Sequence, residues 1–167
     1  KKLGEGEEPF KVIYGAEMNL IFDNKKIVKR PTETNLVDNT YVVFDLETTG
    51  FNAAGVDSII EIGAVKLQNG EIIDRFDELI DPGKEIPERI TKFTGITTEM
   101  VKGKDNEETV VKRFVEWYQD LPMVAHNAKF DISFIEMAMK KYNLGEFKNT
   151  VIDTLELSRT LDQGFAR

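Results

Sequence analysis

Cysteine is absent from the 167-residue chain. This absence excludes a disulfide scaffold, thiol catalysis and a cysteine-ligated metal centre, and it fits a reducing compartment. The sequence also lacks any apolar run close to the roughly 18 residues that a membrane-spanning helix needs, and it shows no signal-peptide core. We therefore expect a cytoplasmic protein that makes no contact with a membrane.

Positive charge is scarce as well, with 22 Lys and Arg against 30 Asp and Glu and a formal net charge of −8. This balance argues against non-specific binding of nucleic acid by a basic surface. It is compatible with a nucleic-acid enzyme whose acidic site works with bound metal ions. Otherwise the composition is that of a soluble globular domain, with 41% hydrophobic residues, and the length suits one domain with an appended segment.

The most informative stretch runs from Tyr41 to Gly50 and reads YVVFDLETTG. A short apolar run of β-branched and aromatic residues that ends at a glycine predicts a buried strand. Side chains alternate along a strand, so Asp45 and Glu47 share one face, roughly 6.5–7 Å apart along the strand. Two negative charges on one face of an apolar strand cost free energy unless a cation neutralises them, and oxygen ligands favour Mg²⁺ or Mn²⁺. The alternative is that the strand ends in solvent and both carboxylates are hydrated.

A second polar group, residues 126–131 (HNAKFD), follows a short apolar strand at 123–125. With Asn127 as the N-cap of a helix, Asp131 lies just past the first turn on the same helical face. A carboxylate in that position is, by itself, a favourable partner of the helix dipole. A strand–helix junction can also bring a third carboxylate to the pair on the earlier strand, and this is the functional interpretation.

The remaining pattern predicts an α/β fold. Three strands in a meander, followed by alternating helices and strands, indicate a mixed sheet with flanking helices. Asn69-Gly70 is a preferred type I′ hairpin turn, and the charged, Pro- and Asn-containing stretch 29–39 predicts a linker with a boundary near residues 30–38. In chain order the expected strands are 41–47, 59–67, 71–80, 123–125 and 151–153, and the expected helices are 87–93, 105–118, 128–142 and 155–161.

The two polar groups together closely resemble the motifs of the DEDD superfamily of 3′–5′ exonucleases. Residues 45–50 (DLETTG) are similar to its first exonuclease motif, and residues 126–131 are similar to its second. Within that superfamily, residues 40–167 most resemble the DEDDh-type proofreading exonucleases of PolC-type DNA polymerase III. The resemblance implies a ribonuclease H-like mixed sheet with flanking helices. Further similar stretches are 59–65 (IIEIGAV), 94–97 (TGIT) and 151–154 (VIDT).

The resemblance divides the chain into an N-terminal segment, residues 1–38, and an exonuclease domain, residues 39–167. The first segment, with YGAE at 14–17, resembles the edge of the PHP (polymerase and histidinol phosphatase) domain into which that exonuclease is inserted. The family also requires a third motif, His-x-Ala-x-x-Asp, which carries the general base and a fourth carboxylate. No such motif follows Asp153, and His126 is the only histidine, so we expect the domain to be incomplete at its C-terminal end.

For this chain the resemblance implies a DNA 3′–5′ exonuclease that uses two Mg²⁺ or Mn²⁺ ions and proofreads for a replicative polymerase III. Hydrolysis of a phosphodiester needs an activated water and a stabilised leaving oxygen, and two hard cations supply both. The implied partners are the 3′ end of single-stranded DNA, the rest of the polymerase polypeptide and the replisome. The implied catalytic and metal-binding residues are Asp45, Glu47 and Asp131. The implied substrate contacts are Thr48, Thr49, Gly50, His126, Asn127 and Phe130, with supporting roles for Asp153 and Glu61.

Two other functions fit the same residues. An exoribonuclease is one, because the two motifs do not distinguish the sugars of DNA and RNA. A non-catalytic domain that binds nucleic acid or other parts of a polymerase is the second, and the missing third motif favours it. Without that motif we expect the 167-residue chain to be weakly active or inactive. Phe51 and Phe130 are candidates to pack on a base, with packing in the core as the alternative.

Overall fold

The computed structural model describes residues 27–33 and 37–162. The PHP-like segment predicted around residues 14–17 lies outside the described residues, so its resemblance stays a prediction. In the described part of the chain, no helix has the length and apolar character needed to cross a bilayer.

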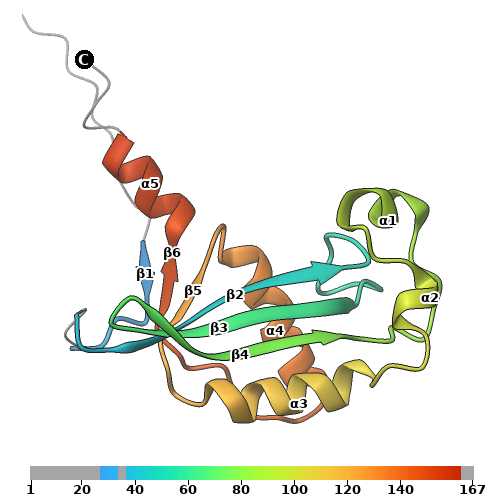
Figure 1. The fold of residues 1–167 in the computed structure, drawn as a ribbon, viewed down its shortest axis with the longest axis horizontal. Coiled ribbons are helices and arrows are strands. Elements are labelled where there is room, and N and C mark those ends of the chain that lie inside the picture. The colour runs from blue at the N-terminus through green and yellow to red at the C-terminus, as the bar shows by residue number, and fades with distance from the viewer. Residues whose placement is uncertain (1–26, 34–36, 163–167) are drawn as a thin grey trace, which may run out of the picture.

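The described residues form a mixed sheet of six strands in the order β1-β6-β5-β2-β3-β4 (Figure 1). The meander β2–β3–β4 is antiparallel, β5 and β6 run parallel to β2, and β1 is antiparallel to β6. The predicted mixed sheet of an α/β fold is therefore confirmed. The strands are β1 (Val28–Lys29), β2 (Thr40–Thr48), β3 (Ile59–Gln68), β4 (Glu71–Leu79), β5 (Met123–Ala125) and β6 (Val151–Asp153).

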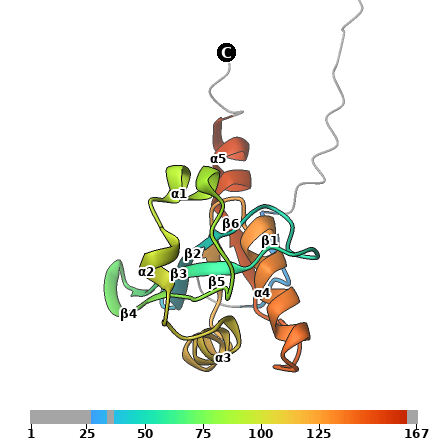
Figure 2. The same cartoon turned by 90° about the vertical axis from the view of Figure 1, so that its right-hand side faces the viewer.

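Two long helices, α3 and α4, flank the sheet and share one apolar core with it (Figure 2). Two short helices, α1 and α2, cover a smaller apolar cluster at the start of β3 and the end of β4, and α5 leads away from the end of β6. The helices are α1 (Glu88–Thr94), α2 (Thr98–Val101), α3 (Glu107–Tyr118), α4 (Lys129–Lys141) and α5 (Thr154–Asp162).

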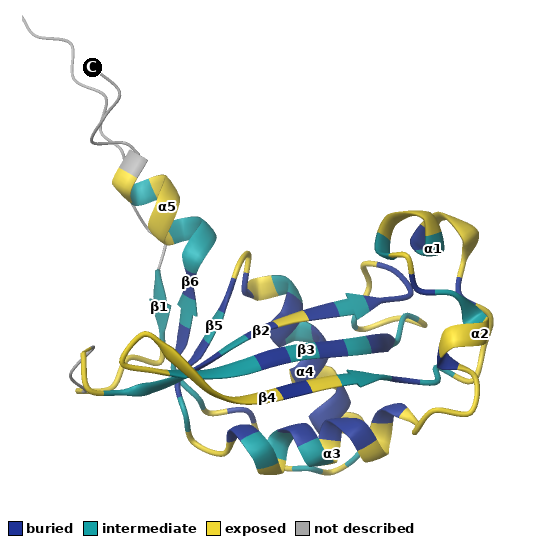
Figure 3. Ribbon diagram, viewed as in Figure 1, coloured by how far each residue is buried: buried dark blue, intermediate teal, exposed yellow. Residues whose placement is uncertain are grey.

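The central strand β2 separates an apolar face from an acidic one. Val42, Phe44 and Leu46 are buried beneath the helices, whereas Asp45 is exposed and Glu47 is half-buried (Figure 3). Burying one such apolar side chain contributes roughly 1.5–3 kcal/mol, so the apolar residues fix which face looks inward. A slip by one residue would turn both carboxylates into the core, and the strand register therefore keeps them at the surface.

The strand β1 is the main departure from the predicted elements. Residues 28–29 pair with residues 151–152, and the backbone N–H of Asp153 donates to the carbonyl of Ile27 at 2.9 Å. A two-residue strand carries no periodic pattern of its own, because its pairing depends on the free edge of β6. The predicted N-terminal segment, residues 1–38, thus contributes a strand to the sheet of the predicted second domain.

Glu107, at the start of α3, joins three elements through one buried carboxylate. Its oxygens accept hydrogen bonds from the backbone N–H of Ile59 (3.0 Å), the ammonium of Lys141 (2.9 Å) and the hydroxyl of Tyr142 (2.7 Å). Burial disfavours the charged form, but these donors outweigh it and lower the pKa of Glu107. The carboxylate therefore ties the start of β3 to the end of α4.

We expect Glu107→Ala to lower the free energy of unfolding by roughly 2–4 kcal/mol, because it leaves the Ile59 amide and the Tyr142 hydroxyl without their acceptor. Urea denaturation measures the change. Glu108→Ala is the matched control, since Glu108 is exposed in the same helical turn, and it should change stability by less than about 0.5 kcal/mol. Equal losses in the two variants would contradict the role given to Glu107.

Candidate active site

Three carboxylates that the sequence groups together line one hollow at the C-terminal end of β2. The hollow has a volume of about 330 Å³ and is bounded by β2, α1 and the start of α4. Asp45, Glu47 and Asp131 lie in its wall, and so does His126. No lysine or arginine of the described residues lines it. The hollow therefore concentrates negative charge without a cationic side chain to balance it.

Asp131 is the most deeply buried of the three carboxylates, with only 2% of its surface exposed. It lies in the first turn of α4, and its Oδ1 atom accepts a hydrogen bond from the backbone N–H of Leu46 at 3.2 Å. Burial and the charge of Asp45 raise the pKa of Asp131 to about 7, although the backbone N–H donors oppose this change. The helix thus brings a third acid against the strand, as predicted, and its charge lacks a balancing cation.

The negative field extends across the sheet from β2 to β4. Glu47 stands opposite Glu61 on β3, and burial followed by the charges of Asp45 and Glu61 raises the pKa of Glu47. Burial, Asp77 on β4 and Asp45 likewise raise the pKa of Glu61. Glu61 lies outside the wall of the hollow and affects it as a neighbouring charge, so its supporting role stays a prediction.

Asn127 is not the N-cap of α4, and that prediction was wrong. The helix begins at Lys129 with Ala128 in the capping position, and Asn127 has a left-handed backbone with φ of 62°. The reason is that the chain makes a tight turn between the strand and the helix, and Asn tolerates the left-handed region better than most residues. Asn127 does not line the hollow, so its substrate contact stays a prediction.

The turn after β2 uses its threonines to hold its own shape. The hydroxyl of Thr48 donates to the carbonyl of Gly50 at 2.6 Å, and the hydroxyl of Thr49 donates to Asp57 at 3.3 Å. A β-carbon on Gly50 would stand 2.5 Å from the carboxylate oxygens of Asp57, so any other residue there would displace the side chain that accepts from Thr49 and Asn52. Of Thr48, Thr49 and Gly50, only Thr48 lines the hollow, and contacts from the other two to a substrate remain untested.

Aromatic side chains rim the acidic hollow. Phe51 and Phe130 both line it, with ring centroids 6.1 Å apart, and Phe51 is 76% exposed. Phe93, from α1, lines the hollow too and is 80% exposed. Phe93 is not recognisable as a site residue from the sequence, because nothing local shows that α1 folds over the end of β2. The only signal was its position directly before Thr94, where the family-like stretch TGIT begins.

His126 and Asp153 belong to two neighbouring strand–helix junctions. The ring Nδ1 of His126 is 3.1 Å from the hydroxyl of Thr154, and His126 lines the hollow. Asp153 is buried outside the hollow and accepts the backbone N–H of Asn127 at 3.1 Å. The charge of Asp153 contributes to the raised pKa of Asp131.

The donors in the hollow fit a hard divalent cation in kind and in charge. They are carboxylate oxygens, which Mg²⁺ and Mn²⁺ prefer, and the raised pKa of Asp131 shows that a positive charge there would be favourable. Within residues 27–33 and 37–162, no group of three or more Asp, Glu or His side chains is arranged to hold a metal ion as it stands. A cation at this position would therefore take further ligands from water, from substrate or from another carboxylate.

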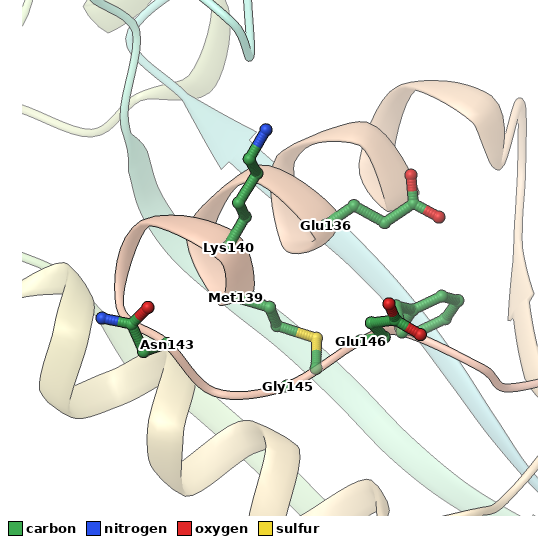
Figure 4. Close-up of a pocket in the computed structure, with 7 residues that line it drawn as sticks. Glu136, Met139, Lys140, Asn143, Gly145 and Glu146 are labelled. Atoms are coloured by element: carbon green, nitrogen blue, oxygen red, sulfur yellow. The ribbon is translucent and has the colours of Figure 1, made fainter.

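A roomier cavity lies elsewhere and carries none of this chemistry. It has a volume of about 670 Å³ and is found at the C-terminal end of α4, between that helix and the segment that follows it (Figure 4). Its walls include Glu136, Lys140 and Glu146, which are charges of both signs. It shares no residue with the acidic hollow, and chemistry rather than volume identifies the candidate site.

The sheet order, with carboxylates on its central strand and on the helix beside it, is that of ribonuclease H-like exonucleases. Residues 42–167 match the family model described as Exonuclease (RNase_T). The chain therefore belongs to the exonuclease family.

Relatives over most of the chain are DNA polymerases. The PolC-type DNA polymerase III of Listeria welshimeri is 50% identical over 151 residues, which are 90% of this chain and 10% of that protein. The corresponding protein of Staphylococcus epidermidis is 45% identical over 157 residues, covering 94% of this chain and 11% of that protein. The chain thus spans about a tenth of the length of these curated relatives.

Solved structures support the fold. E. coli exonuclease I in complex with a dA16 oligonucleotide has a TM-score of 0.65 at 18% identity, over 73% of this chain and 29% of that one. The zinc-bound form of an exonuclease I–single-stranded DNA complex has a TM-score of 0.66 at 18% identity, with the same coverage. The expectation of a ribonuclease H-like exonuclease fold is confirmed.

Proposed function

We propose that this chain is the proofreading exonuclease part of a bacterial PolC-type DNA polymerase III, and that it removes nucleotides from the 3′ end of single-stranded DNA in the cytoplasm. The observation that carries the proposal is the meeting of Asp45, Glu47 and Asp131 in one hollow without a balancing cationic side chain. The relatives named above support the assignment to this polymerase. The rest of the polymerase polypeptide and the replisome are the proposed partners.

In this proposal Asp45, Glu47 and Asp131, together with the fourth carboxylate of the third motif, would hold two Mg²⁺ or Mn²⁺ ions. When bound, such ions make a water nucleophilic and stabilise the leaving 3′-oxygen. Asp45 is exposed in the wall of the hollow, where its carboxylate would hold an ion accessible to the substrate, whereas buried Asp131 is held in place by its hydrogen bond from Leu46. Zinc occupies one of the exonuclease I complexes, and the binding of divalent ions is in keeping with this fold.

The rim of the hollow suits the bases of a single strand. Phe51 and Phe93 expose most of their rings beside the carboxylates, and each base of a single strand offers a face for stacking. Phe130 packs on Phe51 and on Phe134, so in this proposal it supports the ring of Phe51 and also contacts a base. His126 lies where its imidazole can reach the phosphodiester backbone.

Direction and sugar preference are tested together with oligonucleotides labelled at the 5′ end. The assay uses a chain extended through a His-x-Ala-x-x-Asp motif, because residues 1–167 contain no second histidine to act as the general base. We expect a ladder of products that shortens from the 3′ end on DNA with Mg²⁺, and slower cleavage of matched RNA. Release of the labelled 5′ nucleotide as the first product would contradict the direction. Faster cleavage of RNA would favour the exoribonuclease, and no cleavage of either would favour a non-catalytic domain.

A further inference from the structure

Two strand–helix junctions lie next to each other at one edge of the sheet. One joins β5 to α4 and contains residues 126–128, which we call the site turn. The other joins β6 to α5 at Asp153 and Thr154. β5 and β6 are adjacent and parallel, with Ala125 opposite Asp153, so the chain leaves both strands at the same edge (Figure 1).

The carboxylate of Asp153 connects the two junctions. Its side chain is only 6% exposed, and a single atom, Oδ1, accepts three backbone N–H groups. Two of them, from Leu155 at 3.0 Å and Glu156 at 3.4 Å, belong to the first turn of α5. The third, from Asn127 at 3.1 Å, belongs to the site turn. Capping a helix requires only the first two bonds, so the third is a separate function of this side chain.

The site turn needs an external partner, because its backbone is in an uncommon conformation. Asn127 has φ of 62°, a region that residues other than glycine adopt at a cost and that persists where the surroundings hold it. The hydrogen bond to Asp153 fixes the peptide unit between His126 and Asn127. The carbonyl of Asn127 in turn accepts the N–H of Phe130 at 2.9 Å, which begins α4.

Thr154 holds the histidine of the same turn. Its hydroxyl donates to the carbonyl of Ala125 at 3.3 Å and is 3.1 Å from Nδ1 of His126. The hydroxyl of Thr154 therefore contacts both the backbone of β5 and the ring of His126, and the tautomer of the imidazole determines which of Nδ1 and the hydroxyl is the donor.

We propose that Asp153 is a positioning residue, which sets the conformation of the site turn and through it the placement of His126 and Asp131 in the hollow. The path continues from the first turn of α4, where Asp131 accepts the N–H of Leu46 on the central strand. The same oxygen anchors α5, so a displacement of that helix is transmitted to the turn. The catalytic relevance of this role rests on the proposed function, but the geometry does not.

The test compares Asp153→Asn, Asp153→Ser and Asp153→Ala by NMR spectroscopy of the 15N-labelled chain. Asn keeps an oxygen at the same reach, Ser keeps an oxygen that can cap α5 but is too short to reach Asn127, and Ala keeps neither. His126 is the only histidine, so its ring signals report on the site turn without assignment. Trp117, the only tryptophan, lies in α3 and reports by its fluorescence whether the domain stays folded.

We expect the ring signals of His126 to be unchanged in Asp153→Asn and displaced or broadened in Asp153→Ser and Asp153→Ala, with native Trp117 fluorescence. Unchanged ring signals in Asp153→Ser would overturn the proposal, and so would an equal displacement in Asp153→Asn. If Asp153→Ala does not fold, Asp153→Ser still decides, because it retains the helix cap.

Titration with Mn²⁺ adds a readout of function. We expect affinity to be kept in Asp153→Asn and to fall about 10–100-fold in Asp153→Ser, the range found when an outer partner of a metal site is lost. Equal affinity in Asp153→Ser and the wild type would overturn the positioning role. If the wild type binds no Mn²⁺ even when extended through the His-x-Ala-x-x-Asp motif, the proposed function fails, whereas the signals of His126 in the 167-residue chain still decide the role of Asp153.

Discussion

Asp45→Ala should abolish nuclease activity, lowering the rate on single-stranded DNA by on the order of 10³-fold or more. A bound metal ion contributes several kcal/mol to stabilising the transition state, and each 1.4 kcal/mol or so corresponds to a factor of ten in rate. Asp45 is exposed, so its removal leaves no cavity and no unpaired buried group. The variant should therefore unfold at the same urea concentration as the wild type, or at a slightly higher one.

Asp77→Ala is the matched control for this variant. Asp77 lies on the same face of the sheet, opposite Gly63, which in turn stands opposite Asp45. The substitution removes one negative charge close to the site, but Asp77 itself does not line the hollow. We expect it to keep activity within a few-fold, measured as release of nucleotides from the extended chain with Mg²⁺. Activity retained in Asp45→Ala, or an equal loss in Asp77→Ala, would reject the assignment of the site.

Asp131→Asn should separate stability from function. In the absence of metal we expect the variant to be more stable than the wild type at pH 8, while its activity is lost. Burial and Asp45 raise the pKa of Asp131 from its ordinary value of 3.8 to about 7. The folded protein therefore resists ionisation of a group that ionises freely when unfolded. At about 1.4 kcal/mol for each pKa unit, the expected gain is at most roughly 4 kcal/mol.

The sign of the pH dependence follows from the raised pKa. The contribution of Asp131 to stability is complete below its unfolded pKa, near 4, and is lost as the pH rises through about 7. Urea denaturation in EDTA between pH 4 and 8 should show the wild type losing stability relative to Asp131→Asn over that window. Mg²⁺ should restore part of the loss in the wild type alone. If the difference in unfolding free energy between the two proteins stayed constant across this range, the pKa of Asp131 would not be raised in the folded protein.

The central strand and its partner helix could be predicted from the sequence because their signals are local. The alternation of apolar and acidic residues in 41–48 determines both the strand and the face on which Asp45 and Glu47 lie. The position of Asp131 beside these two carboxylates could be predicted because only a short junction separates the strand at 123–125 from the helix that carries it. These features need only the period of a strand and the start of a helix.

Other parts of the site depend on contacts between segments that are distant in sequence. Phe93 lies beside the carboxylates because α1 folds over the end of β2, and no local pattern encodes that placement. Asn127 reads as an N-cap by residue type, yet tertiary structure uses it in a left-handed turn held by Asp153. Side chains that cap helices and those that form tight turns are the same residue types, so the sequence does not separate the two.

The antiparallel pairing of β1 with β6 also has a mechanical consequence. Since Ile27 lies beside Asp153, the start of β1 and the start of α5 lie at the same corner of the sheet. Such proximity is what allows a domain to be inserted into a longer polypeptide without separating the parts on either side. A force pulling the start of β1 away from α5 would break the hydrogen bonds between β1 and β6 one after another rather than all at once. The first of these bonds is the one between Ile27 and Asp153, so tension applied at these two points would reach the site turn before the core.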